Sequence, residues 1–185
     1  MKDLSILIPA RNEAHNILNI LNDLKAQTYD SILFETLVVD DSSTDDTVEL
    51  VEKYNFKNTR LIHLNTFFDE NGEPLTLKKK AIETGIILAK GTLIVTTDAD
   101  CLFPVDWLIT IARFYEKNNA TFIAAPVRIT ATSSLLSVFQ TLDFLTLQGI
   151  TGASVFKRIH SMCNGANLAY EKAAFMEVGG FKGID

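Results

Sequence analysis

Short apolar runs typical of strands alternate with segments of helical periodicity along the first 126 residues, and this alternation limits the possible folds more than any other feature. The predicted strands span 4–8, 34–39, 60–64, 92–97 and 121–126, and the predicted helices span 14–27, 46–54 and 78–89, with one more that opens at Pro104. This order predicts an α/β domain, a three-layer α/β/α sandwich with a mostly parallel central sheet. We expect Pro9 to end the first strand and Asn12 to cap the first helix.

The pattern changes after residue 126. An amphipathic helix is expected over 133–149, a polar turn at 164–167, a short strand at 168–170 and a short helix over 171–178 that two glycines close. The chain has 185 residues, of which 47% are hydrophobic, and this is enough for a single domain with a substantial core.

Charge and cysteine content exclude several classes of protein. The formal net charge is −6, which is opposite to the basic surface that nucleic-acid binding requires. Asp143 divides the most apolar region into uncharged stretches at 129–142 and 144–156, each shorter than the roughly 20 residues of a membrane-spanning helix. Cys101 and Cys163 are too few for a disulfide framework, so we expect reduced thiols and a cytoplasmic location.

Polar clusters follow three of the predicted strands. They are residues 9–13 (Pro-Ala-Arg-Asn-Glu), residues 40–43 (Asp-Asp-Ser-Ser) and residues 98–100 (Asp-Ala-Asp). Ligands of parallel α/β sheets bind at the carboxyl ends of the strands, so we expect one shared site. In an extended segment Asp98 and Asp100 would point to the same side and could both reach one hard cation or a cation-bound phosphate, although a lone Asp-x-Asp is more often a solvated turn.

The second cluster also allows a simpler interpretation. Residues 43–46 (Ser-Thr-Asp-Asp) have the composition of a helix cap. Capping does not account for Asp40 and Asp41, which stand at the end of the strand, where a base or ribose could donate hydrogen bonds to them.

Four ordered motifs resemble the signature of family 2 glycosyltransferases. They lie at 6–13 (ILIPARNE), 38–45 (VVDDSSTD), 97–100 (TDAD) and 164–167 (NGAN), and 178–181 (VGGF) follows them. The resemblance implies a glycosyltransferase-A type fold, a nucleotide-diphosphate sugar donor, Mn²⁺ or Mg²⁺ at the Asp-x-Asp element, and inversion at the anomeric carbon. The chain is also similar to the membrane-tethered subgroup, whose members face the cytoplasm, which implies a place at the cytoplasmic face of the inner membrane.

The resemblance also assigns residues. It implies that residues 1–126 form the nucleotide-binding half and 127–185 the start of the acceptor-binding half. The residues implied to surround the nucleotide and sugar donor are Pro9, Ala10, Arg11, Glu13, Asp40 or Asp41, Lys78, Asp98, Ala99 and Asp100, with Asp98 and Asp100 near the metal. The sugar or acceptor wall would comprise Asn164, Gly165, Ala166 and Asn167, although a turn before a strand explains this segment nearly as well.

Two features depart from the family pattern or leave alternatives open. Leu77 replaces the glycine that usually precedes Lys78, and the three lysines at 78–80 are equally well a solvated helix face. The general base of the family follows its Gly-Gly-Phe element, so we expect that base beyond Asp185, in a chain truncated at its C-terminus and with membrane contact through the missing segments.

The predicted reaction is transfer of a sugar, from a UDP-sugar by preference, to a saccharide or lipid-linked acceptor hydroxyl. The alternatives are a nucleotide-sugar-binding fragment without turnover and, less favoured, a magnesium-dependent phosphotransferase or phosphatase. The second of these would leave the cluster at Asp40 and Asp41 without a role.

Overall fold

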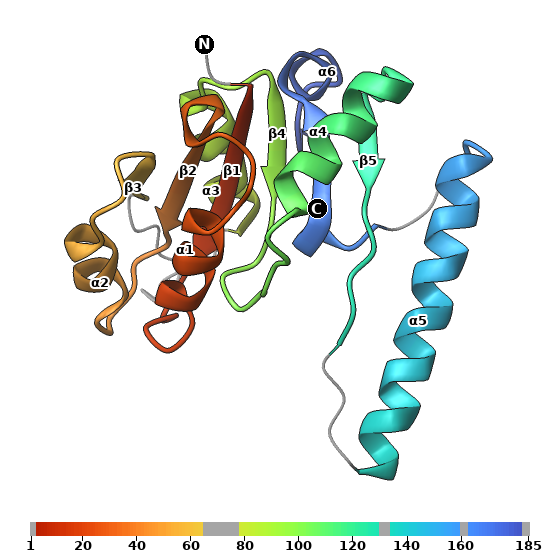
Figure 1. Ribbon diagram of the computed structural model, residues 1–185, viewed down its shortest axis with the longest axis horizontal. Helices are drawn as coiled ribbons and strands as arrows, with labels where there is room; N and C mark the ends of the chain where they lie inside the picture. The colour runs from red at the N-terminus through yellow and green to blue at the C-terminus, as the bar shows by residue number, and fades with distance from the viewer. Residues whose placement is uncertain (1–2, 65–77, 130–133, 160–162, 183–185) are drawn as a thin grey trace.

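A six-stranded sheet forms the centre of the computed structural model, which describes residues 3–64, 78–129, 134–159 and 163–182 (Figure 1). The strands are β1 (Leu4–Ala10), β2 (Phe34–Asp40), β3 (Thr59–His63), β4 (Leu93–Thr96), β5 (Phe122–Ala124) and β6 (Leu168–Glu171), in the spatial order β3-β2-β1-β4-β6-β5. Strands β3, β2, β1 and β4 pair in parallel, whereas β6 runs antiparallel to β4 and β5. Leu77 and Asp185 lie outside the described residues.

Helices cover both faces of this sheet. The helices of the described residues are α1 (Ile17–Lys25), α2 (Thr47–Lys53), α3 (Lys78–Leu88), α4 (Trp107–Asn118), α5 (Leu135–Phe156) and α6 (Lys172–Glu177), with short 3₁₀ turns η1 (Ser31–Leu33) and η2 (Gly165–Asn167). Alternate residues of β1 face opposite sides: Ile6 and Ile8 pack with α1 and α4, and Leu7 packs with Ile86 of α3. The three-layer α/β/α sandwich with a mostly parallel sheet is therefore confirmed.

The first strand does not stop at Pro9, as the sequence analysis expected, but continues to Ala10. The β1 pairing with β4 ends at Leu7, whose carbonyl accepts a hydrogen bond from Thr97 N at 3.1 Å. Pro9 lies two residues further on, so its nitrogen points to the same side as that of Leu7, where β4 has already ended. The strand tolerates the missing N–H because no neighbouring strand needs it there.

The prediction that Asn12 caps the first helix is wrong. Helix α1 begins at Ile17, and Asn16 occupies the N-cap position without a side-chain cap hydrogen bond. Asn12 has a left-handed backbone, with φ of 57°, and its side chain bonds to the loop that follows β2.

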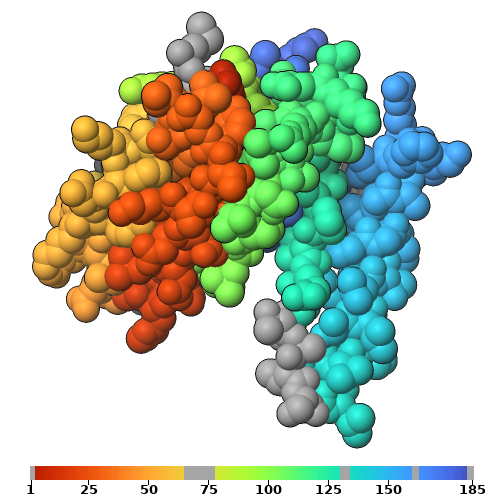
Figure 2. Space-filling view, in the orientation of Figure 1, coloured from red at the N-terminus to blue at the C-terminus, as the bar shows by residue number. Residues whose placement is uncertain are grey.

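Helix α5 is longer than the predicted 133–149, and its polar side faces the body of the protein. It lies at one edge of the molecule in Figures 1 and 2. Its partly buried residues are mostly polar and most lie three or four positions apart: Ser137, Thr141, Phe144, Gln148, Thr151, Ser154 and Val155. The outer side is mostly apolar and exposed, with 91% of Leu135 and 67% of Phe139 accessible. In the part of the chain that the structure describes, no helix combines the length and apolar character needed to cross a membrane.

A buried carboxylate joins three segments at the amino end of the sheet. Glu35 of β2 is 3% exposed and accepts hydrogen bonds from Ser5 Oγ at 2.8 Å, Lys90 N at 2.5 Å and Arg60 Nη1 at 3.1 Å. Burial by itself raises the pKa of the Glu35 carboxyl, but these hydrogen bonds outweigh it, so the pKa is lowered from its ordinary 4.5. The charged form of Glu35 therefore stabilises the fold.

We expect Glu35→Gln to lower the free energy of unfolding by about 2 kcal/mol at pH 7, because it removes the charge from three hydrogen bonds. A folded pKa below the unfolded value means that this contribution is present above about pH 4.5 and is lost as pH falls through the folded pKa. Denaturant unfolding from pH 7 to pH 3 should show the difference between wild type and variant shrinking. Glu52→Gln, on the exposed side of α2, is the matched control; an equal loss in both variants would contradict the role of Glu35.

Candidate nucleotide-sugar site

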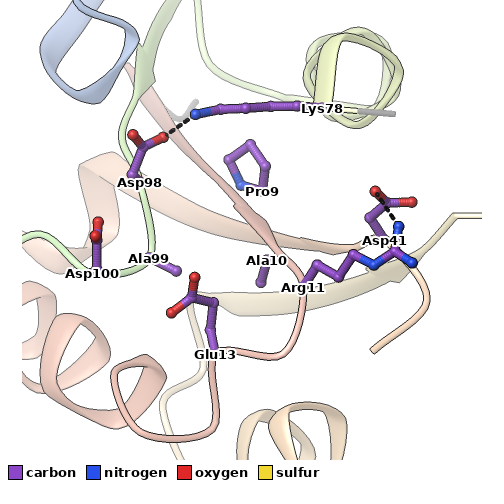
Figure 3. Close-up of a pocket in the computed structure, with 9 residues that line it drawn as sticks. All are labelled: Pro9, Ala10, Arg11, Glu13, Asp41, Lys78, Asp98, Ala99 and Asp100. Atoms are coloured by element: carbon purple, nitrogen blue, oxygen red, sulfur yellow. Dashed lines mark hydrogen bonds and ion pairs between the residues drawn. The ribbon is translucent and has the colours of Figure 1, made fainter. Parts of the chain in front are cut away.

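One pocket lies at the carboxyl edge of the sheet, and the three strand-end clusters converge on it (Figure 3). It has a volume of about 250 Å³. Its lining residues are Pro9, Ala10, Arg11, Glu13, Asp41, Lys78, Asp98, Ala99 and Asp100. The structure thus brings together all but one of the residues that the sequence analysis placed around the donor.

The pocket occupies the crevice between β1 and β4. The two strands pair from Leu4 to Leu7, and beyond that point β1 continues to Ala10 while the chain after Thr96 turns away. Residues 99 and 100 form a turn, so strand alternation does not align Asp98 and Asp100 as expected. Both carboxylates nevertheless line the pocket.

Two ion pairs set the electrostatics of the pocket. Lys78 Nζ, at the start of α3, lies 2.5 Å from Asp98 Oδ1, and Arg11 Nη1 lies 3.7 Å from Asp41 Oδ2 (Figure 3). Side-chain exposure is 54% for Lys78 and 34% for Asp98, so solvent reaches this pair. Lys78 is therefore more than part of a solvated helix face, because its ammonium group points to the pocket and neutralises a carboxylate there.

The remaining acids of the pocket are Glu13 and Asp100. Glu13 Oε2 accepts a hydrogen bond from Asn16 Nδ2 at 2.9 Å, and the thiol of Cys101 lies 4.0 Å from Asp100 Oδ1. The lining therefore contains four carboxylates, Glu13, Asp41, Asp98 and Asp100, against two cationic side chains. This excess of negative charge favours a site that also takes a cation.

Asp40 is the one residue predicted to contact the nucleotide-sugar donor that does not line the pocket. It is the last residue of β2, is 4% exposed, and accepts a hydrogen bond from Ser43 N at 3.2 Å. Its Oδ2 also lies 3.7 Å from Nδ1 of His63, its partner in β3. Of the two neighbouring acids, Asp41 is the one that faces the pocket.

Simple capping does not describe the segment after Asp41. Asp46 is the N-cap of α2 and makes no side-chain cap hydrogen bond. Asp45 accepts from Thr47 N and Thr47 Oγ1 at 3.0 and 2.5 Å, and its other oxygen accepts from Ala14 N at 3.0 Å. The bond to Thr47 is the main cause of a lowered pKa of the Asp45 carboxyl. Part of this cluster therefore binds the loop between β1 and α1.

The segment 164–167 lies at the same edge of the sheet but outside the pocket lining. It reaches that edge because β6 runs antiparallel to β4, so that Leu168, at the start of β6, pairs with Thr96 at the end of β4. Thr96 Oγ1 donates a hydrogen bond to Gly165 O at 3.1 Å.

The two asparagine side chains of this segment bond within the turn and to its neighbours. Asn164 Oδ1 accepts from Ala166 N at 2.9 Å. Asn167 Oδ1 accepts from Trp107 Nε1, and its Nδ2 donates to Pro126 O, both at 3.0 Å. A role of residues 164–167 in an acceptor wall stays a prediction.

Within the described residues, no group of three or more His, Cys, Asp or Glu side chains is arranged to hold a metal ion. A cation here would need ligands from a bound molecule, which is how Mg²⁺ commonly binds, through one or two carboxylates together with substrate phosphates. Asp98 and Asp100 fit this mode of binding. Burial raises the pKa of the Cys101 thiol, and Cys101 and Cys163 are both free.

Comparison with known proteins identifies glycosyltransferases as relatives of this chain. The chain is 31% identical over 121 residues to poly(ribitol-phosphate) beta-N-acetylglucosaminyltransferase TarS of Staphylococcus aureus, an alignment that covers 65% of this chain and 20% of TarS. The chain therefore spans about a fifth of the length of this curated relative.

Solved structures show the same fold. A crystal structure of S. aureus TarS 1-349 in complex with UDP-GlcNAc matches with a TM-score of 0.65 and 20% identity, over 97% of this chain and 48% of that one. The mannosyltransferase PcManGT from Pyrobaculum calidifontis, in complex with GDP-Man and Mn²⁺, matches with a TM-score of 0.65 and 20% identity, over 97% of this chain and 49% of that one.

The sequence signature, the fold and the pocket at the carboxyl edge therefore agree. The model of glycosyl transferase family 2 matches residues 5–179, which is nearly the whole chain, and the protein belongs to this family.

Proposed function

We propose that the pocket binds a nucleotide-diphosphate sugar together with Mn²⁺ or Mg²⁺, and that the protein transfers the sugar to an acceptor hydroxyl with inversion. The observation that carries the proposal is the convergence of three strand-end clusters on one crevice. A UDP-sugar is the preferred donor, supported by the UDP-GlcNAc complex of TarS; the GDP-Man and Mn²⁺ complex of PcManGT supports the use of a metal.

Charge balance supports the divalent cation. The lining has two cationic side chains and four carboxylates, and each cationic side chain is already paired with one of those carboxylates. A diphosphate would add about two further negative charges, whose repulsion from the carboxylates grows in a partly buried site. A divalent cation between the diphosphate and Asp98 or Asp100 would offset that repulsion.

The positions of the lining residues suggest their roles. Asp41, whose side chain is 8% exposed, can accept hydrogen bonds from the base or ribose while Arg11 balances its charge. Lys78 can move its ammonium group from Asp98 toward a phosphate oxygen, because that ion pair is open to solvent. Pro9, Ala10 and Ala99 supply an uncharged wall between these groups.

Transfer needs a leaving group whose charge is stabilised and an acceptor whose proton is removed. When bound, the cation would neutralise charge on the departing nucleoside diphosphate. Lys78 would provide a further positive charge on the same side. Inversion requires the acceptor hydroxyl, of a saccharide or a lipid-linked sugar, to attack from the face opposite the diphosphate.

We expect UDP to bind in a manganese-dependent way and Asp100→Ala to abolish that dependence, because the cation loses a carboxylate ligand. Isothermal titration calorimetry of UDP with and without Mn²⁺ measures both. Asp106→Ala, an exposed aspartate before α4, is the control. Equal stimulation by Mn²⁺ in Asp100→Ala and wild type would contradict a metal role for this residue.

The two neighbouring acids should differ. We expect Asp41→Asn to weaken UDP binding about tenfold, because a charged acceptor that faces the pocket is lost. Asp40→Asn should weaken it less, because Asp40 faces Ser43 and His63 instead. Titration of both variants with UDP and Mn²⁺ gives the comparison, and a larger effect at Asp40 would reverse the assignment.

Binding without turnover is the second candidate, and hydrolysis of the donor distinguishes it from an enzyme. We expect slow hydrolysis of UDP-GlcNAc in the presence of Mn²⁺, detected as released UDP, and loss of this release in Asp100→Ala. UDP-GlcNAc binding with no release, even with saccharide acceptors added, would favour a binding module over an enzyme. Release of inorganic phosphate from UDP, which has the terminal phosphate that UDP-GlcNAc lacks, would instead favour a phosphatase.

A further inference from the structure

We propose that Asn12 is a positioning residue that fixes two nucleotide-facing loops to each other, the first loop after β1 and the second loop after β2. This connection keeps Arg11, Glu13 and Asp41 at a constant spacing. This inference rests on the proposed function of the pocket. Asn12 itself is exposed and does not line the pocket, although both of its neighbours do.

The side chain and the backbone of Asn12 both bond across to the loop after β2. Asn12 Oδ1 accepts hydrogen bonds from Thr44 N at 2.8 Å and from Thr44 Oγ1 at 3.3 Å. Asn12 N donates to Ser43 Oγ at 3.0 Å. One residue of the first loop thus makes three hydrogen bonds to two consecutive residues of the second.

Neighbouring residues extend this connection, which we call the loop clip, defined as the bonds from residues 12–14 to residues 43–47. Glu13 N donates to Thr47 Oγ1 at 2.8 Å, and Ala14 N donates to Asp45 Oδ2 at 3.0 Å. Three consecutive amides of the loop after β1 therefore donate to side chains of the loop after β2 and of the first residue of α2. The clip lies next to both pocket residues of the first loop, because Arg11 directly precedes it and Glu13 is part of it.

Backbone conformation explains why an asparagine stands at this position. Asn12 has φ of 57°, in the left-handed region, where asparagine is one of the few residues with a side chain that is tolerated. The chain bends here, and Arg11 and Glu13 both line the pocket while the residue between them bonds away from it. Glycine would permit the same backbone but would lack the acceptor for Thr44.

The clip joins only part of the pocket. Asp98 and Asp100 follow β4 and take no part in it, so the metal and diphosphate side of the site is built separately from the nucleoside side. Loosening the clip should therefore weaken the binding of a nucleoside diphosphate while the binding of pyrophosphate, which has no nucleoside, stays the same.

The decisive experiment compares Asn12→Gly with wild type by calorimetry, with UDP and with pyrophosphate, each in the presence of Mn²⁺. Asn119→Gly is the matched control, because Asn119 is also exposed and left-handed, with φ of 47°, and ends helix α4. We expect the dissociation constant for UDP to rise about tenfold in Asn12→Gly, and that for pyrophosphate to stay within about twofold. Unchanged UDP binding, or an equal loss for both ligands, would overturn the proposal.

A second measurement tests the clip without any ligand. Amide hydrogen exchange of Thr44, followed by NMR, should be at least about fivefold faster in Asn12→Gly, because that amide loses its acceptor. Asn12→Asp keeps an acceptor oxygen and tolerates the left-handed backbone, so it should restore the protection of Thr44. Unchanged exchange in Asn12→Gly would contradict the clip.

The two measurements also separate this inference from the proposed function. If wild type binds neither UDP nor GDP with Mn²⁺, the proposed function fails. Faster Thr44 exchange in Asn12→Gly would then still support the tie between the loops, and unchanged exchange would contradict it.

Discussion

The separation of β1 and β4 at the carboxyl edge is the constraint on which the pocket depends. The strands are held together from Leu4 to Leu7 and diverge beyond, because β4 ends at Thr96 while β1 runs on to Ala10. The strand order reverses at the same place, with β2 and β3 on one side of β1 and β4 on the other. Successive connections then leave in opposite directions, and this keeps the crevice between them open to a ligand.

Local pattern predicts most of the fold, since most of the strands are short apolar runs between helical segments. In β1, Ile6 and Ile8 pack into one core and Leu7 into the other, as a buried strand with period two requires. The predictions fail where contacts with segments distant in the sequence determine the local structure. Pro9 is tolerated because β4 stops early, Asn12 bonds to another loop instead of capping a helix, and the four residues of β6 carry no signal that they insert antiparallel between β4 and β5.

The same limit applies to the candidate site. Position after a strand predicts that Arg11, Asp41, Asp98 and Asp100 meet in one place, because parallel strands bring their carboxyl ends to one edge. It does not separate Asp40 from Asp41: the last residue of β2 still pairs with β3, and only the next residue is released toward the pocket. Nor does it show that Asn167 is engaged by Trp107, a partner 60 positions away.

Two carboxylates at opposite ends of the same sheet illustrate how the surroundings suit one for stability and the other for the proposed binding of the donor. Glu35, near the start of β2, is 3% exposed and accepts hydrogen bonds from three segments, which replace the water around its charge and stabilise the fold. Asp98, beyond the end of β4, forms one ion pair with Lys78 that remains 34% and 54% exposed. Such a pair contributes little to stability and costs little to open. A carboxylate that must exchange partners when an anion and a cation arrive belongs in the second environment, because in the first its release would leave a buried charge without a partner.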